Sequence, residues 1–218
     1  MRAIIFDMDG LMIDSERLYQ ETQQEMARQF GKTMPEGMRQ RMMGRKPIES
    51  LRLFVEELAI PADPETLLDY RTGIMREKLT HELVPMPGLF HIIDTFYRRL
   101  KLAIGTGAQA EFLDLVIDGL GIREKFDVLQ SSDDIKHGKP DPEIYLNTCR
   151  QLGVDPSECF VLEDALNGVL AGKHAGCHVI AVPTVYTRDQ DFGIADFSAQ
   201  DLFEASRYIE GMLSRSKK

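Results

Sequence analysis

Basic charge, cysteine and long apolar runs are all scarce in this chain. Its 218 residues carry a formal net charge of -9, and surfaces that bind nucleic acid or anionic membranes need a basic face, so we expect neither partner. The few cysteines, Cys149, Cys159 and Cys177, are odd in number, show no C-x-x-C spacing and follow no secretory signal. We therefore expect reduced core residues in a cytoplasmic protein. No apolar stretch approaches the length of a membrane span.

The chain also has no internal repeat and no low-complexity tract, and its 43% hydrophobic residues are ample for a buried core. From about residue 15 to 83, apolar residues recur at helical spacing without a convincing strand. From about residue 86 onward, helical patterns alternate with short apolar strands, as they do in βαβ units. Strands are expected at 3–6, 102–104, 126–129, 160–162 and 179–182.

These patterns predict an α/β fold with a Rossmann-like parallel sheet and helices on both faces. Residues 1–14 and 85–218 would form this core domain, and residues 15–84 would form a small α-helical cap domain inserted after the first strand. Asp63-Pro64 and Asp141-Pro142 each resemble a helix start with proline in the first turn.

Two aspartates, Asp7 and Asp9, follow the first strand directly. Side chains of an extended chain alternate faces, so both carboxylates can point the same way. Two like charges this close are costly, and they are tolerated where a cation binds or where the two groups perform different tasks. A solvated turn ending at Gly10 is the ordinary alternative.

Further polar groups follow the later strands and loops: Thr106, Lys139, and Glu163 with Asp164. In open α/β sheets, ligands bind at the carboxyl ends of the strands. Taken singly, Thr106 is better explained as a helix cap and Lys139 as a solvated loop cation, and the acid pair could be a favourable helix start. Their common placement favours a site.

This order of motifs resembles the haloacid dehalogenase superfamily of phosphotransferases across almost the whole chain. The matching segments are Asp7-Met8-Asp9-Gly10, Ile104-Gly105-Thr106-Gly107, His137-Gly138-Lys139-Pro140 and Leu162-Glu163-Asp164-Ala165. A helical insert between the first two motifs is similar to the cap of the β-phosphoglucomutase-like group.

The chemistry of these groups also suits phosphate esters, whose negative charge must be neutralised before a carboxylate can approach phosphorus. Hard oxygen ligands suit Mg²⁺, and Asp7, Glu163, Asp164 and the carbonyl of Asp9 can supply them. Lys139 would add a positive charge.

The Thr106 hydroxyl, with the N–H groups of Gly107 and Ala108, would hold the remaining phosphate oxygens. Asp7 is the expected nucleophile, forming an aspartyl-phosphate, and Asp9 the expected acid and base.

Two other motifs predict different chemistry. Residues 105–110 fit the G-x-G-x-x-A dinucleotide fingerprint, but no ribose-binding acid follows and the carboxylates stay unexplained. His174 and His178 have the spacing of a zinc pair, although Gly176 is expected to end the helix between them.

The cap should decide which ester is hydrolysed. Arg45 and Lys46 form its most suggestive basic pair, with a solvated loop as the alternative. Mutases of the resembled group carry a cap histidine and a phosphate-gripping arginine, and the aligned positions here are Leu18-Tyr19 and Pro47. We therefore expect a Mg²⁺-dependent phosphatase for a small sugar phosphate or nucleoside monophosphate, with a β-phosphoglucomutase-type mutase as the alternative. The oligomeric state stays open, with a monomer favoured.

Overall fold

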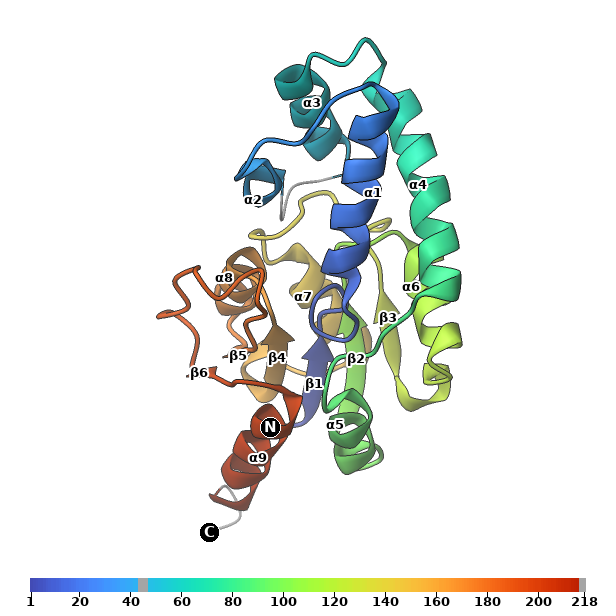
Figure 1. The fold of residues 1–218 in the computed structure, drawn as a ribbon. Helices are drawn as coiled ribbons and strands as arrows, with labels where there is room; N and C mark the ends of the chain where they lie inside the picture. Colours follow the sequence, from blue (N-terminus) through green and yellow to red (C-terminus); the bar gives the residue numbers. More distant parts are fainter. Residues whose placement is uncertain (43–46, 216–218) are drawn as a thin grey trace.

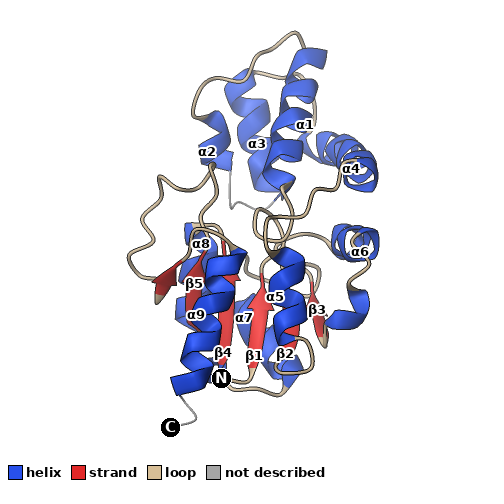
Figure 2. Cartoon of the chain, turned by 60° about the horizontal axis from the view of Figure 1, so that its bottom comes forward, coloured by secondary structure: helices blue, strands red, loops and turns tan. Residues whose placement is uncertain are grey.

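A parallel sheet forms the centre of the computed structural model, which describes residues 1–42 and 47–215. Its strand order is β3-β2-β1-β4-β5-β6, and each neighbouring pair runs parallel (Figure 2). The strands are β1 (Ala3–Phe6), β2 (Lys101–Gly105), β3 (Val128–Gln130), β4 (Cys159–Glu163), β5 (His178–Ala181) and β6 (Phe197–Ser198). The predicted fold class is confirmed.

Helices cover both faces of the sheet because successive side chains of each buried strand point to opposite sides. Ile4 and Phe6 of β1 pack with α5 (Leu89–Phe96), α6 (Ala110–Gly119) and α9 (Leu202–Arg215). Ala3 and Ile5 pack on the other side, with α7 (Glu143–Leu152) and α8 (Leu166–Ala175). Figure 2 shows α5 and α9 in front of the sheet and α7 behind it. Two short 3₁₀ turns, η1 (Arg123–Lys125) and η2 (Pro156–Glu158), precede β3 and β4.

The helices between β1 and α5 stand over the carboxyl ends of the strands (Figure 1). They are α1 (Ser15–Gln29), α2 (Met38–Met42), α3 (Pro47–Leu58) and α4 (Pro64–His81), and we call them the cap. The cap has a buried cluster of its own, which includes Met26, Met38 and Phe54. As predicted, Asp63 begins α4, since its Oδ2 accepts a hydrogen bond of 3.0 Å from the N–H of Thr66.

The two chain segments that connect the cap to the sheet, one before α1 and one after α4, run side by side. The N–H of Asp14 donates to the carbonyl of Val84 at 3.0 Å, and the N–H of Met86 donates to the carbonyl of Met12 at 2.9 Å. Ile13 and Pro85 form an isolated antiparallel bridge between them. The cap is thereby joined to the sheet through one short double-stranded link.

Two local expectations shift by one or two residues. β3 begins at Val128 and not at Phe126, because the Asp127 side chain takes the N–H of Leu102 at 2.9 Å before the ladder begins. α7 begins at Glu143, with Pro142 as its cap residue, and Asp141 Oδ1 accepts from the N–H of Glu143 at 2.9 Å. None of the described helices is both long and apolar enough to cross a bilayer.

Candidate active site

The carboxyl ends of the central strands bring most of the predicted site residues together. Asp7 follows β1 directly and extends its ladder, since its N–H donates to the carbonyl of Leu162 at 3.0 Å. Thr106 follows β2 in the same way, with its N–H donating to Gln130 at 3.0 Å. Glu163 is the last residue of β4. These backbone bonds fix the side chains at one edge of a buried sheet.

Lys139 joins two of these carboxylates. Its Nζ lies 2.5 Å from Asp7 Oδ1 and 2.6 Å from Glu163 Oε1, and all three side chains are largely buried. Burial alone would lower the pKa of Lys139, but the charges of Asp7 and Glu163 outweigh it and raise the pKa above its usual value. Lys139 is therefore a fixed positive charge at this edge.

Glu163 has a second donor that the sequence did not reveal. The hydroxyl of Tyr145, from the first turn of α7, donates to the same Oε1 atom. Tyr145 is fully buried and packs on the sheet face that includes Ile5. Its position in a helical apolar stripe gave it the sequence pattern of an ordinary core residue.

Three buried acids lie close enough to share one ion. Asp7, Glu163 and Asp164 each offer an oxygen, and these oxygens lie within 4.8 Å of one another. Burial, followed by the charges of neighbouring acids, raises the pKa of Glu163 to about 7 and that of Asp164 well above its usual value. One lysine does not neutralise this cluster, so the residues present fit a divalent cation with oxygen ligands.

Two glycines make room for these acids. Gly10 has a φ of +80°, and a Cβ there would lie 2.8 Å from Asp164 Cγ. A Cβ at Gly168 would overlap the carboxyl group of Glu163. The glycine that ends the first motif and the one that follows the fourth are therefore required by the acid side chains themselves.

Asp9 lies beside this cluster with different electrostatics. The protein around it, followed by the charge of Asp7, raises the pKa of Asp9 to about 6. A carboxyl group with a pKa in this range can both hold and release a proton near neutral pH. The Asp9 carboxyl is not one of the three that lie within 4.8 Å of one another, and its acid–base role stays a prediction.

The predicted phosphate-binding turn lies between β2 and α6. Thr106 is fully buried, and its Oγ1 accepts a hydrogen bond of 3.0 Å from the N–H of Ala108. The N–H of Ala108 therefore already has a partner within the turn, which the sequence did not indicate. The cap pair Arg45 and Lys46 lies outside the described residues.

Two cap residues are electrostatically coupled to Asp9. Burial, followed by the charge of Asp9, raises the pKa of Tyr19 of α1, and the charges of Tyr19 and Asp9 oppose the lowering of the Arg71 pKa by burial. The sequence considered Leu18-Tyr19 only as a position that lacks a histidine, and Arg71 carried no signal of its own.

The histidine spacing and the cysteines meet the expectations from the sequence. Gly176, with a φ of +84°, ends α8 between His174 and His178, as expected. The three cysteines are free and buried, which confirms them as core residues.

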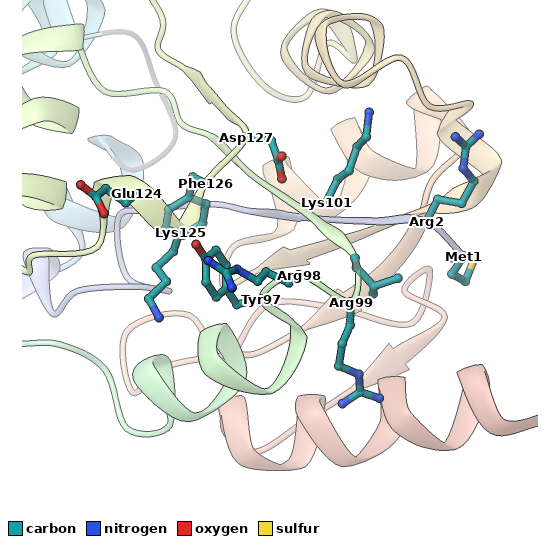
Figure 3. A pocket seen from close by; sticks show the side chains of 11 residues that line it. Met1, Arg2, Tyr97, Arg98, Arg99, Lys101, Glu124, Lys125, Phe126 and Asp127 are labelled. Carbon is teal, nitrogen blue, oxygen red and sulfur yellow. The ribbon is translucent and has the colours of Figure 1, made fainter.

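A cavity of about 590 Å³ lies at the opposite end of the strands, beside Arg2, Lys101 and Lys125 (Figure 3). Two of the cations that line it have partners in the protein. Lys101 Nζ donates to the Leu152 carbonyl at 2.6 Å, and Lys125 pairs with Asp94 at 3.0 Å. It is separate from the acid cluster.

Comparison with known proteins agrees with this geometry. The sequence pattern described as haloacid dehalogenase-like hydrolase matches residues 4–182. The phosphorylated carbohydrates phosphatase of Thermotoga maritima is 36% identical over 181 residues, which cover 81% of this chain and 82% of that protein. The mitochondrial (DL)-glycerol-3-phosphatase 1 of Arabidopsis thaliana is 35% identical over 193 residues, which cover 83% of this chain and 63% of the plant protein.

A solved structure is similar over nearly the whole length. CbbY from Rhodobacter sphaeroides, in complex with phosphate, gives a TM-score of 0.85 at 26% identity and covers 94% of this chain and 96% of its own. Residues 4–182, which match the family pattern, contain all four motifs and the helical insert. This chain therefore belongs to the haloacid dehalogenase-like hydrolase family of enzymes.

Proposed function

We propose that this enzyme is a Mg²⁺-dependent phosphatase that hydrolyses a small sugar phosphate or nucleoside monophosphate through an aspartyl-phosphate on Asp7. The observation that carries the proposal is the buried cluster of Asp7, Lys139, Glu163 and Asp164 at one sheet edge, with Asp9 beside it.

The cation would be held by the carboxylates of Asp7, Glu163 and Asp164 and by the main-chain carbonyl of Asp9. Their oxygens form the hard donor set that Mg²⁺ prefers. When bound, Mg²⁺ supplies positive charge that offsets the negative phosphoryl oxygens.

The protein groups divide the reaction between them. Asp7 attacks phosphorus, and the bond between phosphorus and the ester oxygen breaks as Asp9 gives its proton to the leaving alcohol. Asp9 then takes a proton from a water molecule, which attacks the phosphorus of the aspartyl-phosphate and releases inorganic phosphate. Thr106 and Gly107 hold phosphoryl oxygens, and Lys139 opposes the charge that develops on them.

The substrate class rests on the cap and on the named relatives. Two relatives are named as phosphatases of glycerol phosphate and of phosphorylated carbohydrates. The β-phosphoglucomutase-type alternative is less favoured, because Leu18-Tyr19 and Pro47 align with the cap histidine and the phosphate-gripping arginine of the mutases. We infer a monomer that acts in the cytoplasm on a small phosphorylated metabolite.

A panel of phosphate esters assayed for inorganic phosphate tests the proposal. We expect release with Mg²⁺, loss of release in EDTA, and loss in Asp7→Asn. Asp9→Asn should lose turnover most strongly on esters with poor leaving groups, because these need a proton. No release from any ester, or undiminished release by Asp7→Asn, contradicts the proposal. Faster interconversion of hexose phosphates than hydrolysis, given a bisphosphate primer, would favour the mutase.

A further inference from the structure

Arg71 is a buried cation with one donor that has no acceptor in the described part of the protein. Its side chain comes from α4 of the cap, and the residue is only 6% exposed. Within residues 1–42 and 47–215 it forms no ion pair, and its Nε atom has no hydrogen-bond acceptor. Burying a charged donor without an acceptor is costly, so such groups usually face a ligand or a partner.

The surroundings of Arg71 place this donor on the side of the cap that faces the chemistry. Its Cζ atom lies 5.8 Å from the ring centroid of Tyr19, which comes from the neighbouring helix α1. Burial lowers the pKa of Arg71, while Tyr19 and Asp9 oppose this shift, and the charge of Arg71 in turn lowers the pKa of Asp9. Tyr19 also packs against the buried cluster that includes Met8, the chain neighbour of Asp9. Arg71 and Tyr19 therefore lie on the side of the cap toward the group that delivers a proton to the leaving alcohol.

The chemistry of the two side chains favours one kind of leaving group. The Arg71 guanidinium only donates hydrogen bonds, whereas the Tyr19 hydroxyl both donates and accepts. A hydroxyl of the substrate can satisfy both, by accepting from Arg71 and donating to Tyr19. A carboxylate would also accept from Arg71 but would meet the negative charges of Asp7 and Asp9.

We propose that Arg71 and Tyr19 bind the hydroxyl on the carbon next to the phosphorylated carbon, so that the enzyme selects polyol phosphates. This inference rests on the proposed phosphatase function and narrows its substrate class. It assigns the selection to two described cap side chains from α1 and α4.

The test compares glycerol 3-phosphate with propyl phosphate, which has the same carbon skeleton without hydroxyls. Phosphoglycolate provides a carboxylate in the same region. The ratio of kcat/KM between two esters is the measured quantity, because a change in the fraction of folded enzyme affects both esters equally and cancels. The variants are Arg71→Met, Arg71→Lys and Tyr19→Phe. Arg76→Met is the matched control, since Arg76 lies on the same helix but pairs with Glu111 of α6.

We expect the wild type to prefer glycerol 3-phosphate to propyl phosphate. Arg71→Met should lower this preference about 10- to 100-fold, the effect of one hydrogen bond from a charged donor. Arg71→Lys and Tyr19→Phe should lower it less, and Arg76→Met should leave it unchanged.

An unchanged ratio in Arg71→Met, whatever its absolute rate, overturns the inference and leaves the phosphatase proposal intact. Equal kcat/KM of the wild type for glycerol 3-phosphate and propyl phosphate also overturns the inference and leaves the phosphatase proposal intact. A preference for phosphoglycolate that Arg71→Met abolishes shows that the group bound is a carboxylate and not a hydroxyl. Failure of every enzyme form to release phosphate from any ester refutes the underlying function as well.

Discussion

Tyr145→Phe should weaken metal binding without disturbing the fold. The substitution removes the hydroxyl that donates to Glu163 Oε1 and keeps the buried ring in place. Lys139 still donates to the same oxygen at 2.6 Å, so Glu163 keeps one of its two donors. The change therefore isolates a single hydrogen bond behind the acid cluster.

The size of the effect follows from the charge on Glu163. A hydrogen bond to a charged group contributes about 1.5–3 kcal/mol, which corresponds to about 10- to 100-fold in an equilibrium constant. Groups that orient a metal-binding side chain have effects of the same order on metal affinity. Burial and the charge of Asp7 raise the pKa of Glu163 to about 7, whereas the bond from Tyr145 holds it down. Without this bond the pKa rises further, so more of Glu163 is protonated at neutral pH.

The assay is the Mg²⁺ concentration that gives half-maximal phosphate release, measured at pH 6, 7 and 8. We expect the half-maximal Mg²⁺ concentration to be about 10- to 100-fold higher in Tyr145→Phe than in wild type at pH 7. At pH 8, where Glu163 ionises again, the ratio between the two enzymes should be smaller. Tyr208→Phe is the control, because its hydroxyl bonds instead to His178 Nε2 at 2.9 Å. Equal half-maximal Mg²⁺ concentrations in Tyr145→Phe and wild type would refute the reasoning.

Further predictions concern strain, protonation and surface charge. Gly10→Ala should lower both the melting temperature and the activity, because a Cβ at φ +80° costs about 1–3 kcal/mol and displaces Asp164; a normal melting curve contradicts this. In EDTA, the free energy of unfolding by urea should fall as pH rises from about 4 to 7. The raised pKa values of Asp9 and Glu163, about 6 and about 7, make the folded state bind more protons than the unfolded state in this window; a rising curve contradicts it. Arg76→Ala should change unfolding free energy by less than about 1 kcal/mol, since its pair with Glu111 is half exposed.

The sheet edge was predictable because most of its polar residues stand at strand ends in the sequence. Asp7, Thr106 and Glu163 follow or end short apolar runs, and parallel pairing places such ends together. Lys139 lies in a loop, and only its order among the motifs identified it. The register of β3 was less predictable, since nothing local shows that the side chain of Asp127 replaces a backbone acceptor for Leu102.

The residues that support and surround the site were harder to predict. Tyr145 follows Ile144 in a helix with an apolar stripe, so its sequence position alone indicates an ordinary core residue. Only the folded structure shows that its hydroxyl bonds to Glu163. Arg71 has the sequence pattern of a solvated helix position, and its burial depends on how α4 packs against α1. Such contacts join residues far apart in the chain, so no spacing rule reveals them.

The packing that buries Arg71 also explains how a cap residue can act on the core. Leu18 precedes Tyr19, and Met75 lies one helical turn after Arg71; both are fully buried in the cluster that covers one face of the sheet. Thr22 Oγ1, 3.3 Å from Met75 Sδ, ties the two cap helices together at the same level. The apolar contacts that place Tyr19 and Arg71 near Asp9 are thus shared with the core. A smaller side chain at Leu18 should therefore loosen ester selection before it affects attack by Asp7, which is held by β1, by its backbone bond to Leu162 and by Lys139.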